Sequence, residues 1–437
     1  MNQSIFYSLL PLRIFCIIAG LISLLSVSLP FLNAKPNDFP SAELLFFTND
    51  GTEGGESQFP GFTHQSIWSG LGKASNGKIY FAASNHEHGN GNSAIYVYKP
   101  GEKLLHFIGD VAGASRKTGN WLEGESQFKV HTFMLEHSDG FMYFASMDYA
   151  PSPLLRGAHL YRINTETDEI EDFSQNFPNM LDQALNVVPN TGENRVGSGV
   201  LVEKHGIRGI GLNPQYPDVI YAMTYPDGNI IKTNIVTGDM QVVGKSSNSN
   251  YVFYVDEVGS VYYTSEYEDR EVMYKYDNET SKTRQVGQDL PLGEFGCIAP
   301  TADGRFVYFL HAKSKRVYRL DTKTEFFEYI ATVCGSNWWK IYNMSLSPDE
   351  KSLYFVCNNN DRKAVRRIAL SSRHCVEFIR IDELLGTRDL CFGGIGIWDD
   401  EGSFYSPVWT HSPEKIDLAI LKAKVEKPHP KRKRKKK

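Results

Sequence analysis

The chain has 437 residues, of which 41% are hydrophobic, and this content is sufficient for a sizeable core. An odd number of cysteines with no CxxC spacing lies beyond the apolar N-terminal segment, which argues against a disulfide scaffold and a zinc ribbon (Cys297, Cys334, Cys357, Cys375 and Cys391). The net charge of −5 hides an asymmetry, because the tail Lys427–Lys437 carries eight positive charges and the rest therefore carries −13.

An apolar and uncharged segment, Ile14–Leu32, lies near the N-terminus. Its length fits both a signal peptide and a spanning helix of about 20 residues, so an export signal and a membrane anchor both stay open. Pro30 and the small residue Ala34 favour cleavage. We therefore expect residues 1–34 to direct export to the periplasm or the extracellular space, with anchoring by this segment as the alternative.

A short run that ends in an apolar residue plus tyrosine recurs seven times, at Tyr80, Tyr143, Tyr221, Tyr262, Tyr308, Tyr354 and Tyr405. Successive spacings are 63, 78, 41, 46, 46 and 51 residues, and periods of about 40 to 50 residues are typical of four-stranded propeller blades. Most copies follow a hairpin signal such as Asn76-Gly77, and apolar and polar residues alternate as in half-buried antiparallel strands. A β-sandwich would explain the strands but not seven copies of one pattern. We predict an all-β, seven-bladed β-propeller of four-stranded antiparallel blades over residues 42–426.

The repeated tyrosines fall on the second strand of each blade, counted outward from the channel. Blade one then has strands at 64–70, 78–84, 94–98 and 104–109, and the later blades open near Val130, Gly206, Tyr251, Phe295, Lys340 and Phe392. After Tyr405 the chain has one more good strand, so the last blade lacks its outer strand. We expect residues 42–49 to supply that strand, because this closes the ring and removes an open sheet edge.

This layout places the loops between second and third strands, and those between blades, on one side of the ring, here called the loop-rich face. They include 84–93, 147–158 and the long stretches 111–129 and 172–204, whereas the turns on the opposite face are tight. Because long loops on a rigid scaffold usually carry function, we predict binding on the loop-rich face, at or beside the channel mouth.

Three histidines stand at or just before the start of an innermost strand, where side chains can point into the channel: His64, His131 and His205. Neutral imidazole is a common metal ligand and a ready general base. These three are therefore candidate metal ligands and candidate catalytic residues, and the cofactor they would hold is a divalent metal ion. Each of them taken alone also fits a hydrogen-bonded structural histidine.

Further polar and aromatic residues on the loop-rich face are candidates for ligand binding. Arg208 could clamp a carboxylate or phosphate bidentately. The other candidates are Asp148, Tyr149, Arg156, His311, His411, Trp338, Trp339 and Trp409. Aromatic rings beside carboxylates and amides suit carbohydrate or flat cofactors, although Trp338 and Trp339 also fit packing between blades five and six.

The chain contains no GxSxG elbow, no HExxH, no GxxxxGK, no EF-hand run and no nucleic-acid motif, so the corresponding hydrolase, nucleotide and calcium-loop interpretations fall away. For the basic tail Lys427–Lys437 we weigh a disordered, solvated end against electrostatic attachment to an anionic surface. We expect a monomer.

The pattern Gly-x-apolar-Tyr followed by Tyr-x-x-Asp/Asn-x-x-Thr appears clearly in GSVYYTSEYEDREVMYKYDNET and RFVYFLHAKSKRVYRLDTKT. It resembles the exported bacterial seven-bladed propellers of the quinoprotein-like and lactonase-like groups, over about residues 42–426. A more distant resemblance to virginiamycin-lyase-like and gluconolactonase-like propellers implies a metal at the channel mouth, held by polar side chains. Their catalytic residues do not match this chain position by position, so the resemblance concerns the fold.

Two functional hypotheses follow. The first is an exported module that binds a carbohydrate or another extracellular ligand on the loop-rich face. The alternative is a metal-assisted lyase or lactonase, in which a divalent ion near the three histidines polarises a carboxylate or lactone carbonyl while one histidine moves the proton. Whether the protein is an enzyme stays open at this point.

Overall fold

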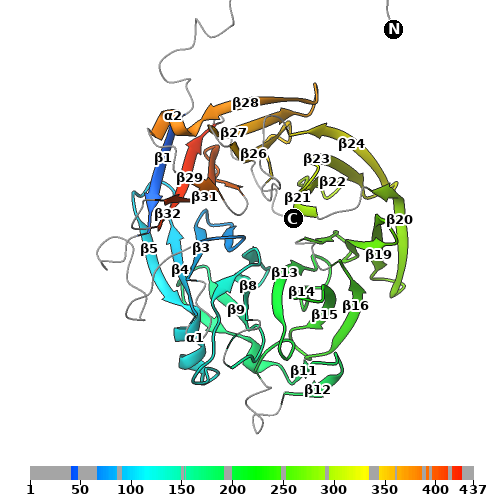
Figure 1. The fold of residues 1–437 in the computed structure, drawn as a ribbon. Helices are drawn as coiled ribbons and strands as arrows, with labels where there is room; N and C mark the ends of the chain where they lie inside the picture. The colour runs from blue at the N-terminus through cyan, green and yellow to red at the C-terminus, as the bar shows by residue number, and fades with distance from the viewer. Residues whose placement is uncertain are drawn as a thin grey trace, which may run out of the picture. The chain divides into compact units, whose positions relative to one another are not determined.

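The computed structural model describes residues 41–47, 66–85, 91–148, 152, 154–190, 199–247, 252–290, 295–333, 344–359, 362–385, 390–392, 396–411 and 416–425. These residues form seven antiparallel blades arranged in a ring (Figure 1). The predicted seven-bladed propeller is thus confirmed. Residues 1–34 and the tail Lys427–Lys437 lie outside the described residues, so the expectations for these two segments stay predictions. Within the ranges given above, no helix has the length and apolar character that crossing a membrane requires.

Five blades consist of four consecutive strands each, in order from the channel outward. Blade one comprises β2 (Leu71–Lys73), β3 (Ile79–Ser84), β4 (Ser93–Tyr98) and β5 (Leu105–Asp110). Blade three comprises β13 (Gly206–Leu212), β14 (Val219–Tyr225), β15 (Asn229–Asn234) and β16 (Met240–Lys245). Blade four comprises β17 (Tyr254–Val255), β18 (Val261–Tyr267), β19 (Arg270–Asp277) and β20 (Lys282–Leu290). Blade five comprises β21 (Phe295–Pro300), β22 (Phe306–His311), β23 (Arg316–Asp321) and β24 (Phe326–Thr332). Blade six comprises β25 (Ser345–Leu346), β26 (Ser352–Asn359), β27 (Arg362–Ala369) and β28 (His374–Arg380), after which comes α2 (Ile381–Leu385).

Blade two carries the additional elements of the two long connections. Its innermost strand is split into β6 (Lys129–Val130) and β7 (Leu135–Glu136), which both pair with β8 (Phe141–Met147). The outer strands are β9 (Leu160–Asn164) and β10 (Ile170–Asp172). Helix α1 (Val111–Thr118) precedes the blade, and the 3₁₀ helix η3 (Ser174–Asn176) and the hairpin of β11 (Asn179–Leu181) and β12 (Val187–Pro189) follow it.

The last blade is closed by a strand from the start of the described chain. It contains β29 (Leu390–Phe392), β30 (Ile397–Trp398), β31 (Ser403–His411) and β32 (Ile416–Lys424), and β1 (Ser41–Phe46) pairs antiparallel with β32. The register runs from Ser41 opposite Lys424 to Phe46 opposite Ala419. This confirms the closing strand that the sequence predicts, and it leaves the ring without a gap between first and last blades.

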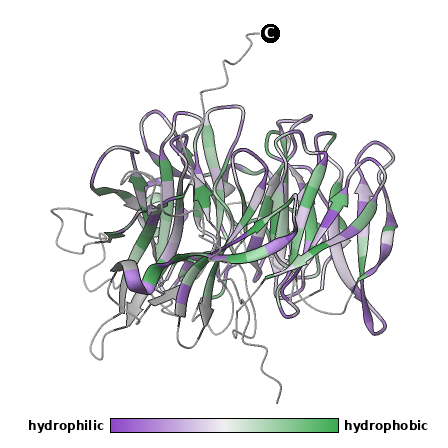
Figure 2. Ribbon diagram, turned by 90° about the horizontal axis from the view of Figure 1, so that it is seen from above, coloured by the Kyte–Doolittle hydropathy of each residue, from purple (hydrophilic) through white to green (hydrophobic). Residues whose placement is uncertain are grey.

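The repeated tyrosines are packing residues of the second strands, as their spacing suggests. All seven are at most 4% exposed. Their hydroxyl groups reach turns on the tight face, in part across to the next blade: Tyr80 donates to Asp168 at 2.7 Å, and Tyr221 donates to the Gly259 carbonyl at 2.7 Å. The tyrosine rings therefore pack in the core, and the hydroxyl groups of Tyr80 and Tyr221 are satisfied at its edge. In Figure 2, hydrophobic residues lie mainly on the strands and hydrophilic residues mainly on the turns.

The boundaries of several innermost strands differ from the predicted ones. In blade one the regular strand is Leu71–Lys73 rather than 64–70, and before it Ser66 forms only an isolated bridge with Ser84. The Gly70 carbonyl still accepts from the Ala82 amide at 2.7 Å, so the strand is an interrupted ladder rather than a continuous one. The predicted opening of blade six at Lys340 lies outside the described residues, and the strand described there begins at Ser345.

The closing strand should contribute to the stability of the whole ring. Leu45 is 7% exposed and packs in one hydrophobic cluster with residues of blades one and seven. We expect Leu45→Ala to lower the free energy of unfolding by about 2–5 kcal/mol, the usual cost of truncating a buried leucine. Urea denaturation followed by tryptophan fluorescence measures this change.

A neighbouring residue of β1 provides the control. Glu43 pairs with Lys422 at 2.8 Å, but its side chain is 58% exposed. Glu43→Ala should therefore cost less than about 1 kcal/mol. Equal effects of the two substitutions would show that β1 is not docked into the core as described.

Candidate functional site

A buried network of charged side chains lies on the outer side of the loop-rich face in blade two. The His159 ring stands between two carboxylates, with Nε2 2.6 Å from Glu125 Oε1 and Nδ1 2.6 Å from Asp172 Oδ2. Arg156 Nη1 lies 2.6 Å from the second oxygen of Glu125. All four side chains are at most 2% exposed. We call Glu125, Arg156, His159 and Asp172 the buried ionic network.

Two members of the buried ionic network, His159 and Glu125, hold each other in their charged forms. Burial alone would lower the pKa of His159, but the charges of Asp172 and Glu125 outweigh it and raise this pKa to about 9. Burial likewise works to raise the pKa of Glu125, yet His159 and Arg156 lower it to about 2. Two cationic and two anionic side chains therefore share one buried site.

Polar side chains join the buried ionic network to both long connections. Ser115 of α1 donates to Asp172 Oδ2 at 2.7 Å. The Asn120 amide donates to the same oxygen at 2.9 Å and to the Gly199 carbonyl at 2.8 Å. Ser174 donates to the Gly199 carbonyl as well, at 2.8 Å. The stretch 111–129 before blade two and the stretch 172–204 after it are thus fixed to a common point.

The chain around Arg156 then positions the segment that leads into blade three. The Arg156 carbonyl accepts from the Lys204 amide at 2.7 Å, and the Ala158 amide donates to the His205 carbonyl at 2.8 Å. Between them, Gly157 has a φ of +125°, and a Cβ there would lie 2.2 Å from the Val202 carbonyl oxygen. Only glycine allows the two segments to approach this closely.

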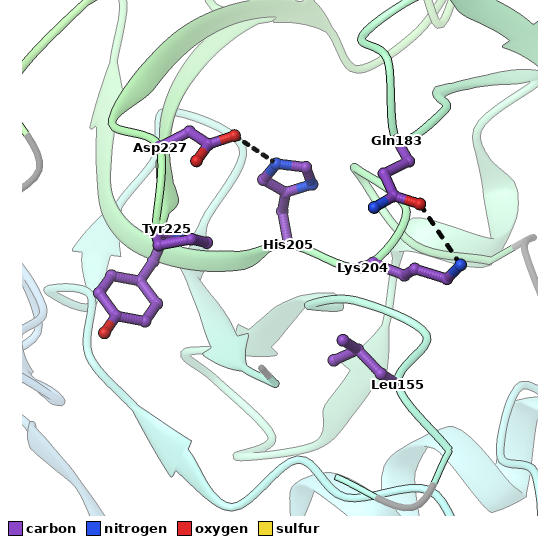
Figure 3. A pocket seen from close by; sticks show the side chains of 7 residues that line it. Leu155, Gln183, Lys204, His205, Tyr225 and Asp227 are labelled. Carbon is purple, nitrogen blue, oxygen red and sulfur yellow. Dashed lines mark hydrogen bonds and ion pairs between the residues drawn. The ribbon is translucent and has the colours of Figure 1, made fainter. Parts of the chain in front are cut away.

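A pocket of about 490 Å³ opens beside these paired segments, lined by Leu155, Gln183, Lys204, His205, Tyr225, Pro226 and Asp227 (Figure 3). His205 Nε2 lies 3.2 Å from Asp227 Oδ2, and Nδ1 lies 2.8 Å from the Glu203 carbonyl oxygen. Lys204 Nζ donates to Gln183 Oε1 at 3.4 Å. The walls of the pocket come from the 154–159 loop of blade two, the β11–β12 hairpin, the segment that leads into β13, and the β14–β15 turn of blade three. All of these belong to the loop-rich face.

The predicted site residues fall into different settings. His205 lines the pocket, and Arg208 follows it on β13, where its guanidinium lies 4.3 Å from the centre of the Tyr225 ring. His131 is 7% exposed and stacks on Trp68, with 6.0 Å between ring centres. His311 ends β22, and its Nδ1 accepts from the Ser314 amide at 3.0 Å.

Two residues predicted to contact ligand are instead enclosed by protein. Arg156 belongs to the buried ionic network, and Asp148 is 0% exposed. Burial raises the pKa of Asp148 to about 7, and its carboxylate accepts from Ser152 Oγ at 2.5 Å and from the Arg156 amide at 3.3 Å. Both side chains are therefore buried and make their contacts within the protein.

The remaining candidates are either outside the described residues or on the last blade. His64, Tyr149, Trp338 and Trp339 lie outside the described residues. Trp409 and His411 belong to β31, opposite Leu418 and Ile416 of β32. In the part of the chain that the structure describes, no three His, Cys, Asp or Glu side chains are arranged to hold a metal ion. Because His64 is not among those residues, the metal site of His64, His131 and His205 stays a prediction.

Several residues of this region have no signal in the sequence. Gln183, Lys204 and Asp227 line the pocket but stand in unremarkable polar loops. Glu125 and Asp172 flank His159 from positions 34 and 13 residues away along the chain. Only the length of the two connections indicated that this part of the molecule differs from the other blades.

Comparison with known proteins assigns this chain to no family. No family model matches the sequence, and no curated protein sequence matches it. Among solved structures, it is similar to an oligogalacturonate lyase in complex with manganese, at 10% identity and a TM-score of 0.49 over 88% of this chain and 97% of that one. It is also similar to a chain of a mitotic checkpoint complex, at 10% identity and a TM-score of 0.46 over 85% and 93%. A chain of a nidogen/laminin complex matches at 11% identity and a TM-score of 0.41 over 74% and 95%. At these identities and TM-scores the similarity supports no conclusion about function.

The buried ionic network should give the protein a distinctive dependence of stability on pH. The folded-state pKa of His159 is raised from 6.5 to about 9, so its contribution is fully present below about pH 6.5 and is lost as the pH rises through 9. We expect this loss to be about 1–3 kcal/mol. Urea denaturation at several pH values between 6 and 9.5 measures it, as the difference between the wild type and His159→Gln.

His106→Gln is the matched control, because His106 pairs with Glu102 on the surface with 46% of its side chain exposed. Its stability profile should follow that of the wild type. His159→Gln should in addition lose about 3–5 kcal/mol at pH 6, because two buried carboxylates lose their shared partner. Parallel profiles for the wild type and His159→Gln would contradict a charged His159.

Proposed function

We propose that this propeller binds a carbohydrate or another hydroxyl-rich small ligand in the pocket beside His205. The observation that carries the proposal is the pocket itself. Its volume of about 490 Å³ is within the usual range for small-molecule sites, roughly 300–1,000 Å³. Export of the chain, which the N-terminal segment predicts, would make this ligand an extracellular or periplasmic one.

The polar groups around the pocket match the chemistry of hydroxyl groups. A hydroxyl group both donates and accepts, and so it needs partners of both kinds. Asp227 offers carboxylate oxygens, Lys204 offers ammonium donors, and the Gln183 amide offers both. In Figure 3, these side chains and His205 come from different segments and surround one space, with Leu155 as an apolar wall. Convergent polar groups on a preformed frame are typical of a binding site.

The proposal is tested with a panel of monosaccharides and disaccharides. Saturation-transfer NMR identifies those that bind, and calorimetry then measures their affinity. For a sugar that binds, we expect Asp227→Asn to weaken the affinity about tenfold or more, because a hydrogen bond to a charged group contributes about 1.5–3 kcal/mol. Gln183→Ala should weaken it by a smaller factor.

Asp239→Asn serves as the control. Asp239 accepts from Thr237 in the β15–β16 turn, which belongs to the tight face of the same blade. This variant should bind like the wild type. The proposal fails if no sugar of the panel binds, or if the Asp239 and Asp227 variants change the affinity equally.

A further inference from the structure

The turns between the first and second strands of the blades surround the channel on the tight face, opposite the loop-rich face. We call them the inner turns, and they span residues 74–78, 137–140, 213–218, 256–260, 301–305, 347–351 and 399–402. Some contact each other or the neighbouring blade directly. The Ala302 amide donates to Glu350 Oε1 at 2.6 Å, and the Ser75 amide donates to Glu136 Oε2 at 2.8 Å. These contacts bring charged side chains of different blades onto one surface.

Carboxylates outnumber cations in the inner turns, and most of these carboxylates are exposed. The exposed ones are Asp139, Asp218, Glu257, Asp303, Asp400 and Glu401. Arg305 of the same surface pairs with Asp321 at 2.6 Å. Within the part of the chain that the structure describes, Glu257, Asp303 and Glu401 take part in no ion pair. The inner turns therefore present negative charge to the solvent around the channel.

The chain leaves the last blade at this same surface. The final strand β32 ends at Lys424, which lies opposite Ser403, the residue that directly follows the inner turn of blade seven. The Val425 amide donates to the carbonyl of Gly402 in that turn at 3.4 Å. The basic tail Lys427–Lys437 begins two residues further along the chain. Its eight positive charges therefore start beside the inner turns.

The length and charge of the basic tail suit the inner turns. Its residues Lys427–Lys437 span up to about 36 Å when extended, and packed sheets lie about 10 Å apart, so the tail can cross the turns of about three blades. One exposed ion pair contributes little. A tethered segment, however, meets the surface at an effective concentration of roughly millimolar, so several weak pairs within one chain suffice to hold it.

We propose that the inner turns of the tight face are the docking surface for the chain's own basic tail. The lysines and arginines of Lys427–Lys437 pair with the exposed carboxylates around this end of the channel. The pocket beside His205 stays open, because it belongs to the loop-rich face. This inference does not depend on the proposed function. It gives the basic tail an acidic partner in its own molecule in place of an anionic surface outside it.

Carbodiimide crosslinking of the full chain tests the inference, because this reagent joins a lysine amine to a carboxylate that it contacts. At low salt we expect crosslinks from Lys427–Lys437 to Glu257, Asp303, Asp400 or Glu401. They should become about fivefold fewer at 0.5 M NaCl, because salt screens exposed charges. A mixture of isotope-labelled and unlabelled chains distinguishes crosslinks within one molecule from those between two. Crosslinks that are absent, mainly intermolecular or mainly to the loop-rich face would overturn the inference.

A variant with fewer carboxylates on the inner turns provides a second test. It carries Glu257→Gln, Asp303→Asn and Glu401→Gln, which keep the side-chain shapes and remove three charges. Trypsin should cleave its tail about threefold or more faster than the wild-type tail at low salt, because cleavage follows the population of the exposed form. Mass spectrometry measures the rate, and urea denaturation shows whether the variant is folded.

The matched control removes the same number of charges from the opposite face. It carries Glu266→Gln, Glu268→Gln and Asp269→Asn, and all three residues are exposed where β18 turns into β19 on the loop-rich face. Its tail should be cleaved at the wild-type rate. Equal cleavage rates for the wild type and both variants would contradict docking of the tail on the inner turns, and equally faster cleavage of both variants would show only an effect of net charge and would overturn the inference as well.

Discussion

The arrangement of the two long connections around blade two depends on one interaction, the placing of His159 between Glu125 and Asp172. Charges are costly to bury, and removing one partner of a buried pair costs about 3–5 kcal/mol because the other charge stays uncompensated. The four members of the buried ionic network come from three separate stretches of chain. The charges balance only when all three stretches are in place. The network therefore stabilises this one arrangement of the three stretches relative to arrangements that leave a buried charge unpaired.

The consequences of this arrangement extend to the pocket. Arg156 contributes its side chain to the network and its carbonyl to the Lys204 amide, so the same residue connects the buried charges with the pocket wall. Asn120 and Ser174 hold Gly199 from the other side. The segment from Gly199 to His205 is therefore fixed at both ends before it enters β13. The ring of blades, closed by β1, supplies the rigid frame, and the network adds a part of the face in blade two that the repeats do not dictate.

The sequence contains the frame in full but only part of the site. The repeated tyrosines recur because every blade needs the same ring at the same place, and a repeated physical need leaves a repeated pattern. His205 and Arg208 were chosen as candidates because they stand at the start of an innermost strand, a position that the repeats locate, and His205 does line the pocket. Arg156 and Asp148 were also placed near the face correctly, but the sequence does not show which way a loop residue turns. The partners of His159 could not be predicted, because Glu125, Asp172 and Gly199 meet only after both long connections have folded.

The central claim is that the buried ionic network positions the pocket wall, and hydrogen–deuterium exchange of the Glu125→Gln variant tests it most directly. The substitution keeps the shape of the side chain and removes its charge. The account predicts faster exchange of the amides in 201–206, where the Leu201, Glu203 and Lys204 amides donate to Ala158, Leu181 and Arg156. It also predicts unchanged exchange in β23 of blade five. Unchanged exchange in 201–206, or an equal increase in β23, would contradict it.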